Sequence, residues 1–219
     1  KLLKETGHNS FRLSISWSRM FKNGFGDVNE KAVEFYNNVI DEMIKNGVEP
    51  FVNLFHFDMP YELQKIGGWE NRLVVEYYAK YAKTCFELFG DRIKYWTTFN
   101  EPIVVVEGQY LYKFHYPCLV DGKKAVQVMF NINLASAKAI EAYRKGEYNK
   151  DGGKIGIVLN LTPSYPRSES KEDLAAAKFA DDFFNNSFLD PAIKGKFPEY
   201  LVEKLTEDKV LWEATEEEI

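Results

Sequence analysis

Tyr95-Trp96-Thr97-Thr98-Phe99-Asn100-Glu101-Pro102 is the stretch that decides the fold. Aromatic and β-branched residues, which favour strands, run directly into an amide, a carboxylate and a proline. Because Pro102 has no backbone N–H and disfavours helical geometry at the residue before it, we expect the strand to end near Asn100 and Glu101. A carboxylate and an amide on the rim of a sheet suit proton transfer to a sugar oxygen. For these eight residues alone, a strand followed by a plain turn is the more ordinary interpretation.

The composition is that of a globular protein with a mixed surface charge. The 219 residues are 45% hydrophobic, with a net charge of −5 and a pI near 5.4. Basic residues are interspersed with acidic ones, so we expect a small or uncharged partner and neither nucleic acid nor a membrane. There is no apolar run of about 18 residues and no signal-peptide pattern at the first residues. With Cys85 and Cys118 as the two cysteines, a reducing cytoplasm is the simpler expectation.

Strand-like and helix-like segments alternate along the chain. Short apolar or aromatic runs predict strands over residues 11–17, 50–55, 94–99 and 154–159. Helical periodicity covers residues 28–46, 71–90, 121–145 and 169–188. Asp27 and Glu30 have the spacing of a capping box for the first of these helices. The alternation predicts an α/β fold in which parallel strands are joined by crossover helices.

Polar residues follow the predicted strands at their carboxyl ends. They are Ser16 to Ser18, His56 with Asp58, Asn100 with Glu101, and Asn160. No phosphate-binding glycine loop follows a predicted strand, which disfavours a nucleotide site. In a closed barrel of parallel strands these ends meet at one mouth, where catalysis takes place. His56 and Asp58 are too few for a catalytic zinc site, which uses three protein ligands, so no metal is expected.

Four motifs in register closely resemble those of the family 1 glycoside hydrolases, retaining β-glycosidases built on a (β/α)₈ barrel. The motifs are Phe11-Arg12-Leu13-Ser14-Ile15-Ser16-Trp17-Ser18-Arg19, His56-Phe57-Asp58-Met59-Pro60, Gly67-Gly68-Trp69 and Asn100-Glu101-Pro102. His115 to Cys118 and Asn160 to Pro166 are similar to segments of the bacterial 6-phospho-β-glucosidases. The resemblance implies a partial (β/α)₈ TIM barrel, roughly its second to fifth strands with their helices, in a single partial catalytic domain over residues 1–219.

The resemblance also implies roles for the strand-end residues. Glu101 is expected to be the general acid/base, and Arg12 to orient and support the nucleophile. Asn100 is expected to bind the sugar 2-hydroxyl and His56 a glycone hydroxyl, with Asn160 as a further substrate-binding residue. The substrate would be a small phosphorylated or neutral β-glycoside, and no cofactor is expected because two carboxylates suffice for the reaction.

The nucleophile motif of the family, Glu-Asn-Gly, does not occur in the sequence. Retaining hydrolysis needs a second carboxylate roughly 5–5.5 Å from the first, so we expect these 219 residues alone to be inactive. A half-closed barrel would expose two strand edges, which predicts self-association into a homo-oligomer or partial unfolding. Two classes stay open. One is the acid/base half of a 6-phospho-β-glucosidase, with unphosphorylated β-glucosides or 6-phospho-β-galactosides as alternative substrates, and the other is a non-catalytic half barrel.

Overall fold

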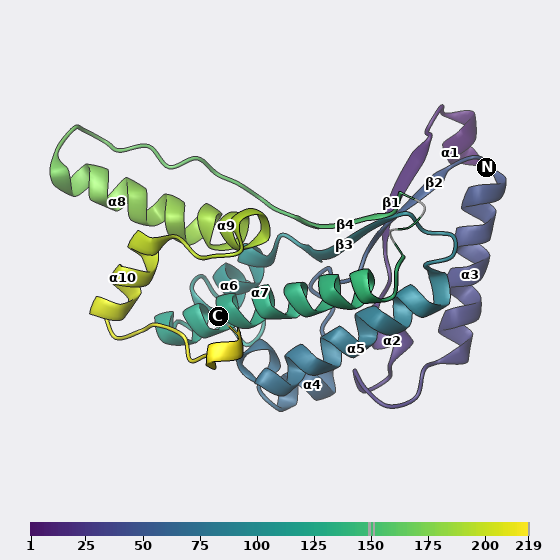
Figure 1. Ribbon diagram of the computed structural model, residues 1–219, viewed down its shortest axis with the longest axis horizontal. Helices are drawn as coiled ribbons and strands as arrows, with labels where there is room; N and C mark the ends of the chain where they lie inside the picture. Colours follow the sequence, from purple (N-terminus) through teal and green to yellow (C-terminus); the bar gives the residue numbers. More distant parts are fainter. Residues whose placement is uncertain (149, 151, 219) are drawn as a thin grey trace. The chain divides into compact units, whose positions relative to one another are not determined.

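The computed structural model describes residues 1–148, 150 and 152–218, which form two compact units (Figure 1). The first unit contains Lys1–Asn100 and Ala135–Val158, and the second contains Glu101–Leu134 and Leu159–Ile219. The division passes through the long helix α7 (Gly122–Lys145) and between Asn100 and Glu101. All four strands therefore belong to the first unit.

A parallel sheet forms the centre of the first unit. Its strands are β1 (Ser10–Ser14), β2 (Glu49–Asn53), β3 (Tyr95–Asn100) and β4 (Lys154–Val158). They lie side by side in chain order, and each pairs in parallel with the next. The predicted α/β fold with parallel strands is confirmed, and it is that of a partial (β/α)₈ barrel.

The first strand is shorter than the sequence predicts, because Trp17 is not part of it. The chain leaves β1 after Ser14 and forms the short helix α2 (Trp17–Met20). The indole of Trp17 is fully buried, stacks on Tyr81 with ring centroids 5.4 Å apart, and donates to the Gly24 carbonyl at 3.0 Å. These core contacts outweigh the strand preference of the aromatic and β-branched run.

Helices cover one side of the sheet in the first unit (Figure 1). Besides α2, the helical elements within residues 1–100 are α1 (Leu2–Glu5), α3 (Glu30–Lys45), α4 (Tyr61–Lys65), the 3₁₀ turn η1 (Gly68–Glu70) and α5 (Arg72–Phe89). The Asn71 side chain accepts the Leu73 N–H at 3.0 Å, so α5 begins where the sequence predicts. The predicted cap of α3 at Asp27 is wrong: the cap is Asn29, whose side chain accepts the Lys31 N–H of the first turn at 3.2 Å.

Buried aromatic rings fill the space between the sheet and α5. Phe99, at 0% exposure, lies 4.7 Å from the Tyr78 ring and 5.4 Å from the Trp69 ring. Trp17 and Trp96 are buried as well, so both are core aromatic residues rather than exposed platforms for a sugar. The end of β3 is therefore packed against buried aromatic side chains.

The second unit is helical. Its elements are α6 (Pro102–Tyr110), the first part of α7, α8 (Lys171–Asp181), the π-helical turn η2 (Asp182–Asn186), α9 (Ser187–Lys194), α10 (Glu199–Glu207) and the 3₁₀ turn η3 (Glu216–Glu218). The helix predicted over residues 169–188 is thus interrupted by η2 and continues beyond Phe188. Within the described residues, no helix has both the length and the apolar character that crossing a bilayer requires.

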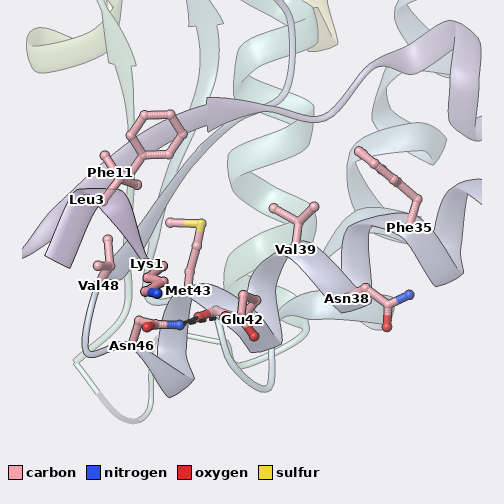
Figure 2. A pocket seen from close by; sticks show the side chains of 10 residues that line it. All are labelled: Lys1, Leu3, Phe11, Phe35, Asn38, Val39, Glu42, Met43, Asn46 and Val48. Atoms are coloured by element: carbon pink, nitrogen blue, oxygen red, sulfur yellow. Dashed lines mark hydrogen bonds between the residues drawn. The ribbon is translucent and has the colours of Figure 1, made fainter. Parts of the chain in front are cut away.

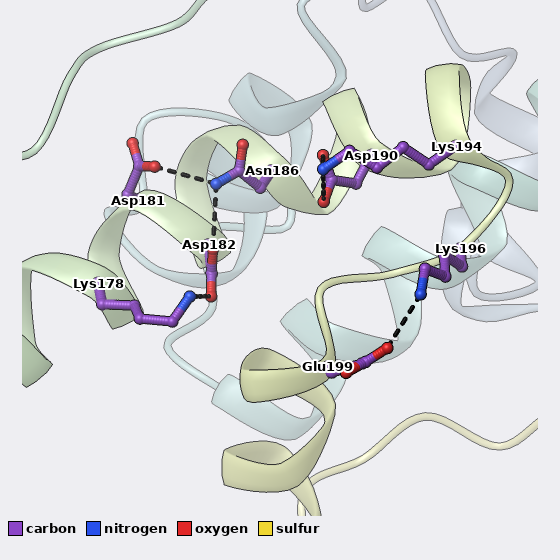
Figure 3. A network of polar contacts seen from close by, with 8 residues as sticks. All are labelled: Lys178, Asp181, Asp182, Asn186, Asp190, Lys194, Lys196 and Glu199. Carbon is purple, nitrogen blue, oxygen red and sulfur yellow. Dashed lines mark hydrogen bonds and ion pairs between the residues drawn. The ribbon is translucent and has the colours of Figure 1, made fainter.

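A polar network holds the π-helical turn (Figure 3). Asp182 is buried, pairs with Lys178 at 2.7 Å and accepts from the Asn186 amide at 3.0 Å. The neighbouring Asn185 accepts the Thr162 N–H at 2.9 Å and donates to the Thr162 carbonyl at 2.8 Å. These two bonds tie the segment after β4 to the turn.

The outer strand β1 borders an open groove on the side of α1 and α3 (Figure 2). The groove has a volume of about 460 Å³, and its lining residues are mostly apolar: Lys1, Leu3, Phe11, Phe35, Asn38, Val39, Glu42, Met43, Asn46 and Val48. Phe11 on β1 is 42% exposed. An edge strand beside exposed apolar side chains is a surface on which another chain can pair or pack.

Candidate active site

A row of polar side chains crosses the sheet near the carboxyl ends of its strands. Ser14, Asn53 and Thr97 are register partners on neighbouring strands, so they share one face of the sheet. The Asn53 amide donates to Ser14 Oγ at 3.3 Å and to the Phe55 carbonyl at 2.8 Å, and it accepts from Thr97 Oγ1 at 2.8 Å. Because both ends of this buried amide are bonded, the row fixes the strands against one another. Sequence reasoning missed this row, although the polar Asn53 within the apolar run of residues 50–55 could have indicated it.

Arg12 and Asn100 form a hydrogen bond on the same face of the sheet as this row. Arg12 Nη2 donates to Asn100 Oδ1 at 2.6 Å, and Asn100 is only 2% exposed. A guanidinium group has donors only, so the amide oxygen must face it. The amide nitrogen of Asn100 is then left to donate to another group.

A β-bulge in β3 places Asn100 on the face of the sheet that carries Arg12. The register pairs Thr97 with Gly156 and then Asn100 with Val158, so Thr98 and Phe99 together oppose Ile157. Strict alternation from Thr97 would turn Phe99 toward the face of Arg12 and Asn100 away from it. The extra residue reverses this, and bulges have this effect beside many active sites.

Left-handed backbone conformations occur just beyond β2 and β3. Phe57 has φ 68°, and Glu101 has φ 45° and ψ 63°. A residue with a Cβ pays about 1–2 kcal/mol for this conformation, and such strain gathers at functional sites. Glu101 is the N-cap of α6 and Pro102 its first residue, so the predicted exclusion of Glu101 from helical geometry is confirmed. This end of the sheet therefore carries both the polar side chains and the backbone strain.

His56 and Asp58 form the loop after β2. The Asp58 carboxylate accepts the Trp17 N–H at 3.1 Å and the His56 N–H at 3.2 Å, so it organises two loops. The His56 ring is exposed and lies 5.1 Å from the Phe57 ring. In the part of the chain that the structure describes, no three His, Cys, Asp or Glu side chains gather as a metal site would require.

Two tyrosines bind the ends of β1 and β2 and were missed as polar residues by sequence reasoning. The Tyr36 hydroxyl accepts the Ser16 N–H at 2.8 Å. The Tyr81 hydroxyl lies 2.8 Å from the Ile15 carbonyl oxygen and 2.9 Å from the Leu54 carbonyl oxygen, and it can donate its proton to either. Burial raises the pKa of Tyr81 well above its usual range, so the hydroxyl stays a donor. Helical periodicity marks these side chains as core but does not show where their hydroxyl groups bind.

The predicted site residues fall into two groups. Arg12 and Asn100 are in direct contact, and His56 follows the strand between theirs. Glu101 and Asn160 belong to the second unit, one residue after β3 and two residues after β4, and Asn160 is exposed. All five thus follow or occupy the strands from which the sequence predicts a site.

Comparisons with known proteins agree on one family. The sequence model of the family "Glycosyl hydrolase family 1" matches residues 1–219. The chain is 65% identical over 205 residues to the 6-phospho-beta-glucosidase GmuD of Bacillus subtilis (strain 168), which is 94% of this chain and 43% of that protein. It is 46% identical over 200 residues to a 6-phospho-beta-galactosidase of Clostridium acetobutylicum, 90% of this chain and 41% of that protein.

Solved structures give the same result. A family 1 β-glucosidase from Thermotoga maritima superposes with a TM-score of 0.88 at 40% identity, over 97% of this chain and 47% of that chain. The chain therefore spans less than half the length of these relatives. Because the family model matches the whole sequence and the fold agrees, the chain belongs to glycosyl hydrolase family 1.

Proposed function

We propose that the chain is the acid/base half of a retaining β-glycosidase that acts on 6-phospho-β-glucosides. The observation that carries this proposal is the Arg12–Asn100 hydrogen bond of 2.6 Å, directly before Glu101 in the chain. It leaves the amide nitrogen of Asn100 to donate to the 2-hydroxyl of a sugar, a contact that strengthens in the transition state of glycoside cleavage. The remaining guanidinium N–H groups of Arg12 would face the nucleophilic carboxylate.

Glu101 acts in both steps of the proposed reaction. It first donates its proton to the glycosidic oxygen, while a second carboxylate attacks the anomeric carbon and the bond to the leaving group breaks. Glu101, now ionised, then takes a proton from water, whose oxygen attacks the anomeric carbon and displaces the second carboxylate. That second carboxylate would come from sequence that the longer relatives have beyond the matched region. His56 and Asn160 would contact sugar hydroxyls.

The preference for phosphorylated glucosides rests on the activities for which the relatives are named. The B. subtilis relative at 65% identity is a 6-phospho-beta-glucosidase. The C. acetobutylicum relative at 46% identity is a 6-phospho-beta-galactosidase, and the T. maritima relative at 40% identity is a β-glucosidase. Identity thus favours the 6-phosphoglucoside, with the other two substrates as alternatives. Phosphorylated sugars are cytoplasmic metabolites, so we place the enzyme in the cytoplasm.

A chimera tests this proposal. The aligned part of B. subtilis GmuD is replaced by this chain, and the remaining GmuD sequence supplies the second carboxylate. We expect the chimera to hydrolyse methyl 6-phospho-β-glucoside with a higher kcat/KM than the 6-phosphogalactoside or the unphosphorylated glucoside. Glu101→Gln should lower kcat/KM by about 10²–10⁴-fold, because the poor leaving group needs a proton. Glu107→Gln, a change at another glutamate in the second half of α6, is the matched control and should retain activity.

Azide separates the acid/base role from a general loss of structure. Azide attacks the glycosyl intermediate without a general base, so it should restore turnover of an aryl 6-phospho-β-glucoside by the Glu101→Gln variant. A folded chimera that cleaves none of the three glycosides would contradict the proposed function. Equal activity before and after Glu101→Gln would contradict the assignment of Glu101.

A further inference from the structure

The bulge in β3 is held from the side of α5 and α7. The hydroxyl of Tyr78 on α5 donates to the Thr98 carbonyl, inside the bulge. Ser136 on α7 lies 2.8 Å from Thr98 Oγ1, and Thr98 Oγ1 in turn donates to the Gly156 carbonyl at 3.3 Å. Both the main chain and the side chain of Thr98 are therefore fixed, two residues before Asn100.

Tyr78 is suited to hold this position permanently. Its side chain is fully buried, with its ring 5.5 Å from Trp17 and 4.7 Å from Phe99. Burial also raises the pKa of Tyr78 well above its usual range, so the hydroxyl remains protonated. A buried protonated hydroxyl needs an acceptor for its proton. The ring is locked by packing, and the hydroxyl is directed at a single carbonyl.

We infer that Tyr78 is a positioning residue for Asn100: its hydroxyl keeps the bulge in place, and the bulge turns the Asn100 amide toward Arg12 and the substrate. This inference rests on the proposed function, because it assumes that Asn100 binds the sugar. Tyr78 touches neither Arg12 nor Asn100 through its hydroxyl bond, so it acts through the backbone of Thr98. Without the hydroxyl, the carbonyl loses a buried donor, and the regular two-residue alternation becomes a competing conformation.

The test is Tyr78→Phe in the chimera, which removes the hydroxyl and keeps the ring. We expect kcat/KM on the 6-phosphoglucoside to fall about tenfold, mainly through kcat, because the contact of Asn100 is strongest in the transition state. Tyr143→Phe is the matched control. Tyr143 is also buried, and its hydroxyl donates to the Tyr148 carbonyl at 3.1 Å, in the turn before β4. This control should leave kcat unchanged.

A double-mutant cycle with Asn100→Ala separates positioning from a general structural role. If Tyr78 acts through Asn100, Tyr78→Phe should change kcat/KM by less than about twofold once Asn100→Ala is present. A loss of activity that is the same in both backgrounds would overturn the inference, and so would activity of Tyr78→Phe equal to that of Tyr143→Phe. If the unmodified chimera is inactive, the proposed function fails. The crystal structure of Tyr78→Phe then decides the inference, which an unchanged Arg12–Asn100 hydrogen bond would overturn.

Discussion

The inner strand β3 and the outer strands β1 and β4 differ in how far they are covered. From Trp96 to Asn100 every residue of β3 is buried, whereas all the described residues of β1 and β4 are exposed or half-buried. The covered strand ends in the residues proposed to act on the sugar, and β1 borders the apolar groove. The comparison shows that the strand leading to the site is covered in this chain, while the outer strands lack the cover that β3 has.

The largest expected effect is on the packing at the covered strand. Phe99→Ala in the isolated chain should lower the free energy of unfolding by about 3–5 kcal/mol, because the ring is fully buried among aromatic side chains. Phe11→Ala on β1 is the matched control, and we expect a change within about 0.5 kcal/mol in the isolated chain. Urea unfolding followed by circular dichroism measures both. Equal losses for the two variants would contradict the difference in cover.

The outer strands should decide association of the isolated chain. We expect the 219-residue chain to form oligomers in size-exclusion chromatography with light scattering, since β1 offers an open edge. Phe11→Lys should raise the monomeric fraction, because a charge on an edge strand opposes pairing. Ile66→Lys is the control, since Ile66 is 44% exposed against 42% for Phe11 but lies at the end of α4. An isolated chain that is monomeric and stable would contradict this account of the edges.

Backbone strain should be measurable at the end of the covered strand. Glu101→Gly should raise the free energy of unfolding by about 1 kcal/mol, because glycine adopts the left-handed conformation without a steric cost. Glu101→Ala removes the same carboxylate but keeps a Cβ, so its stability should match that of the unsubstituted protein. Thermal unfolding compares the two. If both variants gain stability equally, the carboxylate rather than the backbone carries the cost.

The smallest expected effect is a pH dependence at Glu107 on α6. Partial burial raises the pKa of Glu107, so the folded state favours its protonated form. The stability from this group is present below its ordinary pKa of about 4.3 and is lost as the pH rises through the raised value. Glu107→Gln keeps the group neutral and should raise the melting temperature at pH 7 by about 1 °C, with no gain near pH 4.

Glu141 provides a control of opposite sign. The hydrogen bond from Lys145 lowers the pKa of Glu141, so its ionised form is favoured in the folded state. Glu141→Gln should therefore give no gain in melting temperature at pH 7. A gain of the same size in both variants would show that removal of negative charge, and not burial of Glu107, is responsible.

Local signals in the sequence predicted the regular parts of the fold. Asn71 and Gly90 bound a stretch with helical apolar periodicity, and α5 occupies the residues between them. The π-helical turn after α8 was not predictable in this way, because the apolar periodicity runs through it. The first strand was predicted too long because the burial of Trp17 depends on α5, which is distant in sequence.

The site was predicted from motifs, and its geometry was not. Arg12 and Asn100 are 88 residues apart, so no local pattern indicates that they touch. The bulge that orients Asn100 depends on how β3 pairs with β4, more than 50 residues later in the chain. The Tyr78 hydroxyl likewise finds its acceptor only in the folded sheet. Sequence patterns thus identified which residues matter, while pairing between distant strands determined how they are arranged.

The most direct measurement is a crystal structure of the chimera with glucose 6-phosphate bound. We predict that Asn100 Nδ2 lies within about 3.2 Å of the sugar 2-hydroxyl, while Asn100 Oδ1 still accepts from Arg12. The Glu101 carboxyl group should face the oxygen on the anomeric carbon. A sugar bound away from the carboxyl ends of β1 to β3, or an Asn100 amide turned away from its 2-hydroxyl, would contradict the proposed role of this chain.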